Sequence, residues 1–274
     1  MIEHSQPSQT IIPPVVSPLP VDRRWNRDLT PADAFRWLAL GWRDFCNTPL
    51  PSIVYGLFVF LLSAAIVYGL FKFELDYILF PALAGFMVVG PILAVGPYAK
   101  SRRIAEGKPV TLFSMIFVRP AAGAQIMFTG VLLCLLMLVW MRAAVIVYAL
   151  FFGLVPFPGL NHIAPMLFGT PTGWAMLIVG SVIGALFAAF SFGISAFSIP
   201  MQLDRRVDAL TAMGSSMALV WHNMATMLTW AAIMLALILL SIATGLVGLI
   251  VVFPVLGHGT WHAYLAMRQE RAAP

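Results

Sequence analysis

Charged side chains are scarce in this sequence. They make up 10% of its 274 residues, whereas a soluble domain usually carries about 25%. Apolar residues make up 61%, and the mean hydropathy is +0.92. A soluble globular domain with a charged surface is therefore excluded. The composition predicts an all-α membrane protein that crosses the bilayer several times.

Cysteine and the common catalytic motifs are also scarce or absent. The two cysteines, Cys46 and Cys134, lie far apart, which excludes a disulfide framework and a CxxC metal site. The sequence has no P-loop, GxSxG or dinucleotide-binding motif, and no segment outside the apolar runs is long enough for a soluble active site. We expect no enzymatic activity and no tightly required cofactor.

Long apolar runs are what the sequence has in abundance. About 20 apolar residues span a bilayer as a helix. We predict a six-helix transmembrane bundle with spans near residues 52–71, 78–99, 124–152, 173–200, 225–243 and 246–266. The last two share one run of about 40 residues, about 60 Å as a single helix, which is twice the hydrocarbon thickness. We place the turn between them in "SIATGLVG", Ser241 to Gly248.

The basic residues predict the orientation. Fourteen of the 16 lysines and arginines lie before the first span, after the last, or in the connections that follow the second and fourth spans. The net charge of +5 thus fits membrane topology better than nucleic-acid binding, and the lipid bilayer is the expected partner. By the positive-inside rule, both termini are cytoplasmic.

An amphipathic helix is expected just before the first span. In "TPADAFRWLALGWRDFCNTPLPS", Thr30 can cap a helix and Pro31 suits its first position, while Phe35, Leu38, Trp42 and Phe45 fall at helical spacing. Trp37 and Trp42 favour headgroup depth. We predict an interfacial cytoplasmic helix over 31–47 within a segment 30–50; an ordinary soluble cap helix is the alternative.

The remaining chain divides simply. Residues 1–20 hold five prolines and no basic residue, so we expect no secretory signal peptide. We assign 1–29 to a disordered cytoplasmic tail, 51–267 to the six-span domain and 268–274 to a cytoplasmic C-terminal tail.

Two segments echo one another. "PYAKSRRIAEGKP" begins at Pro97 and "PMQLDRRVDALTA" begins at Pro200, and in each an Arg-Arg pair follows five residues after the proline. Spans two–three and four–five are therefore either copies of one unit, related by parallel symmetry, or similar only by composition.

His258 and His262 are the first candidate site. They stand one helical turn apart near the end of the last span, a spacing that suits two ligands of one metal or haem. The glutamate of the HExxH motif is missing. The structural alternative is an interfacial cluster with Trp261 and Tyr264, and a third alternative is proton handling.

A second set of polar residues is expected at the same membrane level. Asp204 and Asp208 lie one turn apart and could orient the imidazoles, and His222 and Asn223 could join them in a polar cluster. The alternative is a solvated connection helix. Arg142 is the one charge well inside a predicted span, where it would either contact an anion or substrate, or snorkel outward.

Four motifs, in order along the chain, resemble a known family. They are "LALGWRDFCNTPLPSIVYGL", "VVGPILAVGPY", "SIPMQLDRRVDALTAM" and "GLIVVFPVLGHGTWHAY". Over about residues 30–266 the chain resembles the bacterial predicted integral-membrane proteins of the domain-of-unknown-function 2189 family. The resemblance implies a multi-pass protein of the bacterial inner membrane and no particular activity. Members often have "DRDVDAVTA" and "WHAYRDL", so the chain departs from the family at Arg206 and at Leu265 and Ala266.

Three functions remain open. The first is a non-enzymatic accessory or scaffold protein of a membrane complex, bound to a membrane-protein partner or to a second copy of itself. The second is a small-solute transporter or channel, which the repeat, the prolines and Arg142 would suit. The third is a haem- or metal-binding respiratory accessory protein that uses His258 and His262.

Overall fold

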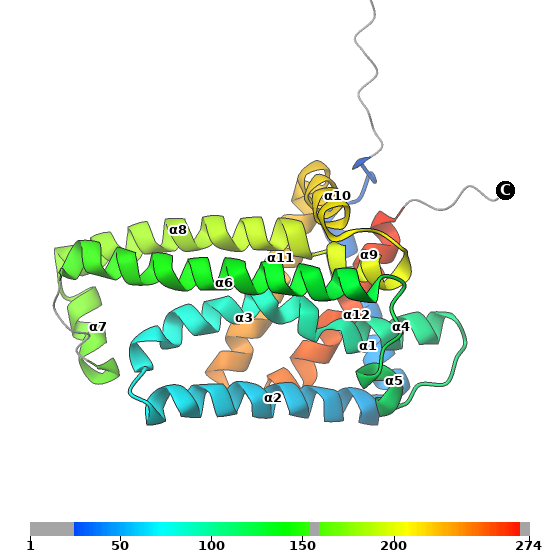
Figure 1. Ribbon diagram of the computed structural model, residues 1–274, viewed down its shortest axis with the longest axis horizontal. Helices are drawn as coiled ribbons and strands as arrows, with labels where there is room; N and C mark the ends of the chain where they lie inside the picture. Colours follow the sequence, from blue (N-terminus) through cyan, green and yellow to red (C-terminus); the bar gives the residue numbers. More distant parts are fainter. Residues whose placement is uncertain (1–24, 154–158, 269–274) are drawn as a thin grey trace, which may run out of the picture.

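The computed structural model describes residues 25–153 and 159–268, and within these ranges every regular element is a helix (Figure 1). Long helices run along the bundle and short helices gather at its two ends. The all-α fold class is confirmed. Residues 1–24 and 269–274, which the sequence assigns to two tails, lie outside the described residues.

Six spans, two of them kinked, are long and apolar enough to cross a membrane, as predicted. They are α2 (Pro49–Lys72), α3 continued by α4 (Leu79–Leu93 and Val95–Ala105), α6 (Gly123–Phe152), α8 continued by α9 (Pro171–Ser195 and Ser198–Asp204), α11 (Met224–Ala243) and α12 (Leu249–Met267). A break of one residue after Leu93 and a break of two residues after Ser195 separate the halves of the kinked spans.

The last apolar run turns back where the sequence predicts. α11 ends at Ala243 and α12 begins at Leu249, and Gly245 and Leu246 between them have φ of 64° and 70°. This left-handed backbone reverses the chain without a proline. The Thr244 hydroxyl accepts a hydrogen bond from the Gly248 amide at 3.1 Å, so the turn satisfies its own polar groups.

The short helices distinguish the two ends of the bundle. One end, called the basic end below, holds α1 (Pro31–Asn47), α4, α5 (Leu112–Ile116), α9 and α10 (Ala209–His222), and α7 (Leu160–Phe168) lies at the other (Figure 1). The first described segment and the end of α12 meet at the basic end, because Arg27 Nε donates to the Met267 carbonyl at 2.7 Å. Six crossings bring the chain back to the end where it starts.

Helix α1 has the predicted bounds. The Thr30 amide and hydroxyl both donate to the Asp33 carboxylate, at 2.8 and 2.9 Å, and Pro31 occupies the first helical position. These contacts start the helix because they satisfy groups at its N-terminus that have no partner within the helix.

One face of α1 packs against the bundle. Trp37 is buried on it, with its ring edge-on to that of Trp230 at 5.9 Å between centroids, and the headgroup depth of the tryptophans stays a prediction. Trp42 and Phe35 are exposed. The physical reason is Gly41, whose Cα lies so close to Gly259 and the Val255 carbonyl of α12 that a Cβ would clash. The small residue, rather than the aromatic ones, decides which face packs.

Two prolines leave backbone carbonyls without their helical hydrogen bonds, and a neighbouring helix packs against each of these carbonyls. Proline has no amide hydrogen, so Pro97 leaves the carbonyl of Leu93 without its helical donor. The Tyr55 hydroxyl of α2 donates to this carbonyl at 2.7 Å. Pro254 likewise frees the carbonyl of Ile250, and Gly56 of α2 lies directly against that oxygen. Both freed carbonyls therefore face α2.

The two echoing segments adopt similar structures. Each is a helix that follows a break in a span, and each leads through a short helix, α5 or α10, into the next span. Arg102 of the first segment donates to the Leu203 carbonyl of the second at 2.7 Å. The local arrangement recurs, and the duplication itself stays a prediction.

Replacing Gly56 by alanine should destabilise the bundle. A Cβ at this position would lie 2.0 Å from the Ile250 carbonyl oxygen, so α2 and α12 would have to separate. Gly69→Ala in the same helix is the matched control, since nothing lies within 4 Å of its Cβ position. We expect a lower thermal midpoint in detergent for Gly56→Ala, and an unchanged or higher one for Gly69→Ala because alanine favours a helix by about 1 kcal/mol. Equal midpoints would contradict the close packing.

Candidate functional site

Six polar side chains come together at the basic end, where α4 and α12 meet the junction of α1 and α2. This polar cluster consists of Asp44, Ser52, Lys100, Ser101, His258 and His262. Four helices contribute to it, although its members are up to 218 positions apart in the chain.

Lys100 lies at the inner end of the polar cluster and is fully buried. Its ammonium donates to the carbonyls of Thr48 and Phe45, at 2.7 and 3.4 Å, and to the Ser52 hydroxyl at 2.8 Å. The last carbonyls of a helix lack helical donors and carry partial negative charge. Lys100 therefore caps the C-terminal end of α1 from a neighbouring helix.

His258 is fully buried and connects Ser52 to Ser101. Its Nδ1 lies 3.0 Å from the Pro97 carbonyl and 2.9 Å from Ser101 Oγ, and its Nε2 lies 3.1 Å from Ser52 Oγ. A carbonyl can only accept, so Nδ1 carries the hydrogen. Ser52 accepts from Lys100 and can thus donate its own hydrogen to Nε2. This pattern fits a neutral imidazole whose tautomer is fixed by its partners.

His262 and Asp44 form the outer part of the polar cluster, with 2.8 Å between His262 Nε2 and the Asp44 carboxylate. Burial by itself raises the pKa of Asp44, but hydrogen bonds from His262 and Ser101 outweigh it and leave this pKa below its usual value. A cavity of about 210 Å³ adjoins the pair and is lined by Asp44, Ser101 and His262 among others.

Binding of a metal or haem by the two histidines stays a prediction. They lie one turn apart as predicted, but both ring nitrogens of His258 are engaged in hydrogen bonds within the protein. Within residues 25–153 and 159–268, no group of three His, Cys, Asp or Glu side chains is placed to hold a metal ion. The donors present suit internal hydrogen bonding.

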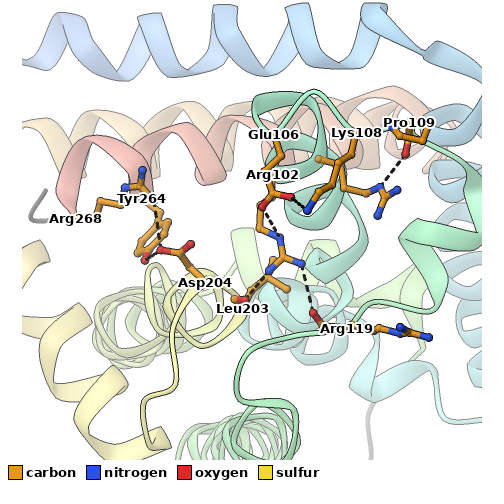
Figure 2. Close-up of polar contacts among 10 residues, drawn as sticks. Arg102, Glu106, Lys108, Pro109, Arg119, Leu203, Asp204, Tyr264 and Arg268 are labelled. Carbon is orange, nitrogen blue, oxygen red and sulfur yellow. Dashed lines mark hydrogen bonds and ion pairs between the residues drawn. The ribbon is translucent and has the colours of Figure 1, made fainter. Parts of the chain in front are cut away.

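The expectation that Asp204 and Asp208 orient the imidazoles is wrong, because the carboxylate that contacts His262 is Asp44 of α1. Asp204 instead accepts from the Tyr264 hydroxyl at 2.7 Å and pairs with Arg268 at 3.4 Å (Figure 2). Asp208 caps α10 by accepting from the Thr211 amide at 2.9 Å.

The other expected members of that set are dispersed. His222 is exposed and contacts the Ala218 carbonyl of its own helix. Asn223 accepts from the Arg27 amide at 2.9 Å and donates to the Trp25 carbonyl at 2.8 Å, which holds the segment before α1. Trp261 is buried with its ring 5.4 Å from that of Tyr264.

Arginine 102 ties the polar connections together at the basic end. Its guanidinium donates to the carbonyls of Leu203 and Arg119, at 2.7 and 3.3 Å, and approaches the Glu106 carboxylate at 3.9 Å (Figure 2). It thereby joins α4 to the end of α9 and to the segment that leads into α6. The first arginine of the Arg-Arg pair in this segment thus has a structural role, because it holds three parts of the chain together.

Arg142 lies on the outside of the bundle. It is exposed, and no hydrogen bond or ion pair joins its guanidinium to another of the described residues. Its depth follows from Trp140, whose ring nitrogen donates to the carbonyl of Pro81 in the first turns of α3 at 3.0 Å. Arg142 is therefore level with the beginning of α3, toward the end of the bundle opposite the basic end.

Sequence reasoning missed Lys100, Ser52, Ser101 and Asp44 as members of the site. A hydropathy profile places Lys100 among the cations of a connection between spans. It places Ser52 at the start of a span, with no sign of a polar role. The sequence could have shown this if the helix had been continued past Pro97. Lys100 and Ser101 then lie on a helix that is still inside the bundle.

Residues 79–204 match the family described as predicted integral membrane protein (DUF2189). This stretch, called the DUF2189 stretch below, is similar to that family over 126 of the 274 residues. The match covers α3 to α9 and is shorter than the resemblance over residues 30–266. Of the polar cluster, Lys100 and Ser101 lie inside the DUF2189 stretch and the other four members lie outside it. No curated protein and no solved structure matches the chain.

Asp44→Asn should remove a pH-dependent part of the stability. Because the folded-state pKa of Asp44 is lowered, its contribution is present above about pH 4 and is lost as the pH falls through the lowered pKa. We expect Asp44→Asn to cost about 1–3 kcal/mol at neutral pH and less below pH 4, measured by unfolding in detergent across this range. Glu106→Gln, at an ion pair on the surface, is the control and should change little. A loss that does not vary with pH would contradict the assignment.

Lys100→Met should loosen the junction of α1 and α2. Methionine keeps the length of the side chain but leaves the Thr48 and Phe45 carbonyls without their donor, at a cost of at least about 2 kcal/mol. We expect a lower thermal midpoint and faster protease cleavage near residues 45–50. Lys108→Met, at an exposed lysine that pairs with Glu106, should change neither. Wild-type stability of Lys100→Met would show that the capping role is wrong.

Proposed function

We propose that the chain is a non-enzymatic accessory or scaffold protein of a membrane complex. The observation that supports this most is the use of the polar cluster: each of its side chains is hydrogen-bonded to another helix or helix end. Such a cluster makes a rigid bundle with a fixed outer surface, which is what a scaffold requires.

An enzymatic reading of the polar cluster is not favoured. Ser52 and His258 are close enough for a nucleophile and its general base. Both are fully buried, and neither lines the 210 Å³ cavity beside Asp44. Moreover, His258 Nδ1 faces a carbonyl and a hydroxyl rather than a carboxylate. A substrate would have no route to the hydroxyl of Ser52.

Transport of a small polar solute is also less well supported. Carbonyls freed by proline can line a polar path in transporters. Here the Leu93 carbonyl is bonded by Tyr55, and the Ile250 carbonyl is covered by Gly56. A cavity of about 750 Å³ along the spans is lined mainly by apolar side chains.

The surface around Arg142 is our proposed contact for the partner. Leu138, Val139 and Ile146, which lie three or four positions from Arg142 on α6, are all exposed. An arginine on the outer surface of a span is costly in lipid unless it finds a polar partner or reaches the interface. A carboxylate of a neighbouring membrane protein, or of a second copy of the chain, would complement it.

Co-purification in mild detergent with mass spectrometry tests the proposal. We expect a stoichiometric membrane-protein partner that is lost from Arg142→Leu and retained in Arg142→Lys, because the positive charge is the contact. Lys72→Leu, at an exposed cation of α2, is the matched control and should keep the partner. A visible spectrum of the same sample tests the haem alternative. A monomer in all four proteins, or a partner that persists in Arg142→Leu, would overturn the proposed contact.

A further inference from the structure

A long apolar cavity lies along the bundle and opens to its outside, where the lining residues Phe80, Val145 and Leu235 are exposed. It has a volume of about 750 Å³ and lies between α3, α6, α8, α11 and α12. Residues of α8 line it from Met176 to Ser195, which at about 1.5 Å per residue is a length of about 30 Å. Figure 1 shows α6 and α8 extending side by side, with the shorter α3 next to α6. The cavity is thus elongated along the spans.

Small residues on α8 leave this space open. Gly180, Gly184 and Ala188 follow each other at four-residue spacing, and all three line the cavity. Their spacing places them on one face of the helix. A Cβ at Gly184 would lie 3.1 Å from the Trp140 ring and one at Gly180 would lie 3.7 Å from Val147, so larger side chains there would fill the space between α8 and α6.

One polar atom in the wall lacks a partner. Of five buried side-chain atoms with no hydrogen-bond partner among the described residues, Ser191 Oγ is the one whose residue lines the cavity. Ser191 is 3% exposed. Ser181, Ser195 and Thr260 also line the cavity, whose wall is mainly apolar. A buried hydroxyl without a partner costs about 1–3 kcal/mol, so Ser191 Oγ points to a ligand group that bonds it.

The wall also limits the chemistry of the ligand. None of the cavity-lining residues is charged, so a charged headgroup would find no counter-ion. Ser191 is 15 positions from Met176, about 22 Å along α8. A hydrocarbon chain that extends from Ser191 to Met176 would therefore be longer than the roughly 15 Å of one leaflet, which is half of the hydrocarbon thickness.

We infer that this cavity binds a single long hydrocarbon chain of a neutral lipid, whose ester, alcohol or quinone-type oxygen hydrogen-bonds with Ser191. The chain lies along α8, and its polar group lies toward the basic end of the bundle. The inference does not depend on the proposed partner contact at Arg142, which lies on the exposed face of α6.

Photolabelling of the full chain in phosphatidylcholine nanodiscs tests the inference. The two probes are a diazirine-bearing polyisoprenoid alcohol and a diazirine-bearing monoacylglycerol. We expect saturable labelling that maps to peptides of α3, α6 or α8 and is competed by the unmodified compound. Competition by one of the two identifies the source of the chain, as polyisoprenoid or acyl lipid. Labelling that neither compound competes would overturn the inference.

Two neighbouring alanines provide the matched variants. Ala188 and Ala189 are both exposed residues of α8, but Ala188 lines the cavity and Ala189 does not. Ala188→Phe should reduce saturable labelling at least about fivefold, and Ala189→Phe should leave it unchanged. Ser191→Ala, a mild change that keeps the cavity, should weaken probe binding between about twofold and tenfold through the lost hydrogen bond. Equal labelling of Ser191→Ala and the wild type, with Ala188→Phe also unchanged or unfolded, would overturn the inference.

Discussion

Water is scarce inside the spans, so every polar group placed there must find its partner within the protein. This constraint explains the packing around α2 and α12. The Leu93 carbonyl, freed by Pro97, is bonded by Tyr55 of α2, and the α1 carbonyls are bonded by Lys100 of α4. Each of these bonds joins two helices. The kinks of the spans and the contacts between them are therefore consequences of one requirement.

The same requirement accounts for the polar cluster. A lysine and a histidine that are both fully buried would be costly alone, and each needs several hydrogen bonds. Serines 52 and 101 supply them because a hydroxyl can accept from one neighbour and donate to the next. The result joins α1, α2, α4 and α12 into one unit. The DUF2189 stretch contributes α4 to this unit, and the flanking helices supply the rest.

The side chains of the polar cluster are occupied by hydrogen bonds to one another and to helix ends. The two proposals therefore rest on other parts of the molecule, the outside of the spans and the apolar cavity along α8. Arg142 lies on the first of these surfaces and Ser191 lines the second. Both differ from the polar cluster in having no hydrogen-bond partner among the described residues. They are the positions at which the proposed partner and the inferred lipid chain would each complete an unsatisfied polar group.

The number of spans, the bounds of α1 and the turn after Ala243 were determined by the sequence itself. Bilayer thickness, helical caps and hydropathy act over 20 residues or fewer, so local sequence is sufficient to predict them. The i, i+4 placement of His258 and His262 is local in the same sense. Their partners are not: whether His262 contacts Asp204 or Asp44 depends on which helix crosses α12 at that level. Only the tertiary structure decided this, because the close approach of Gly41 to Gly259 brings α1, 218 positions away, against the last span.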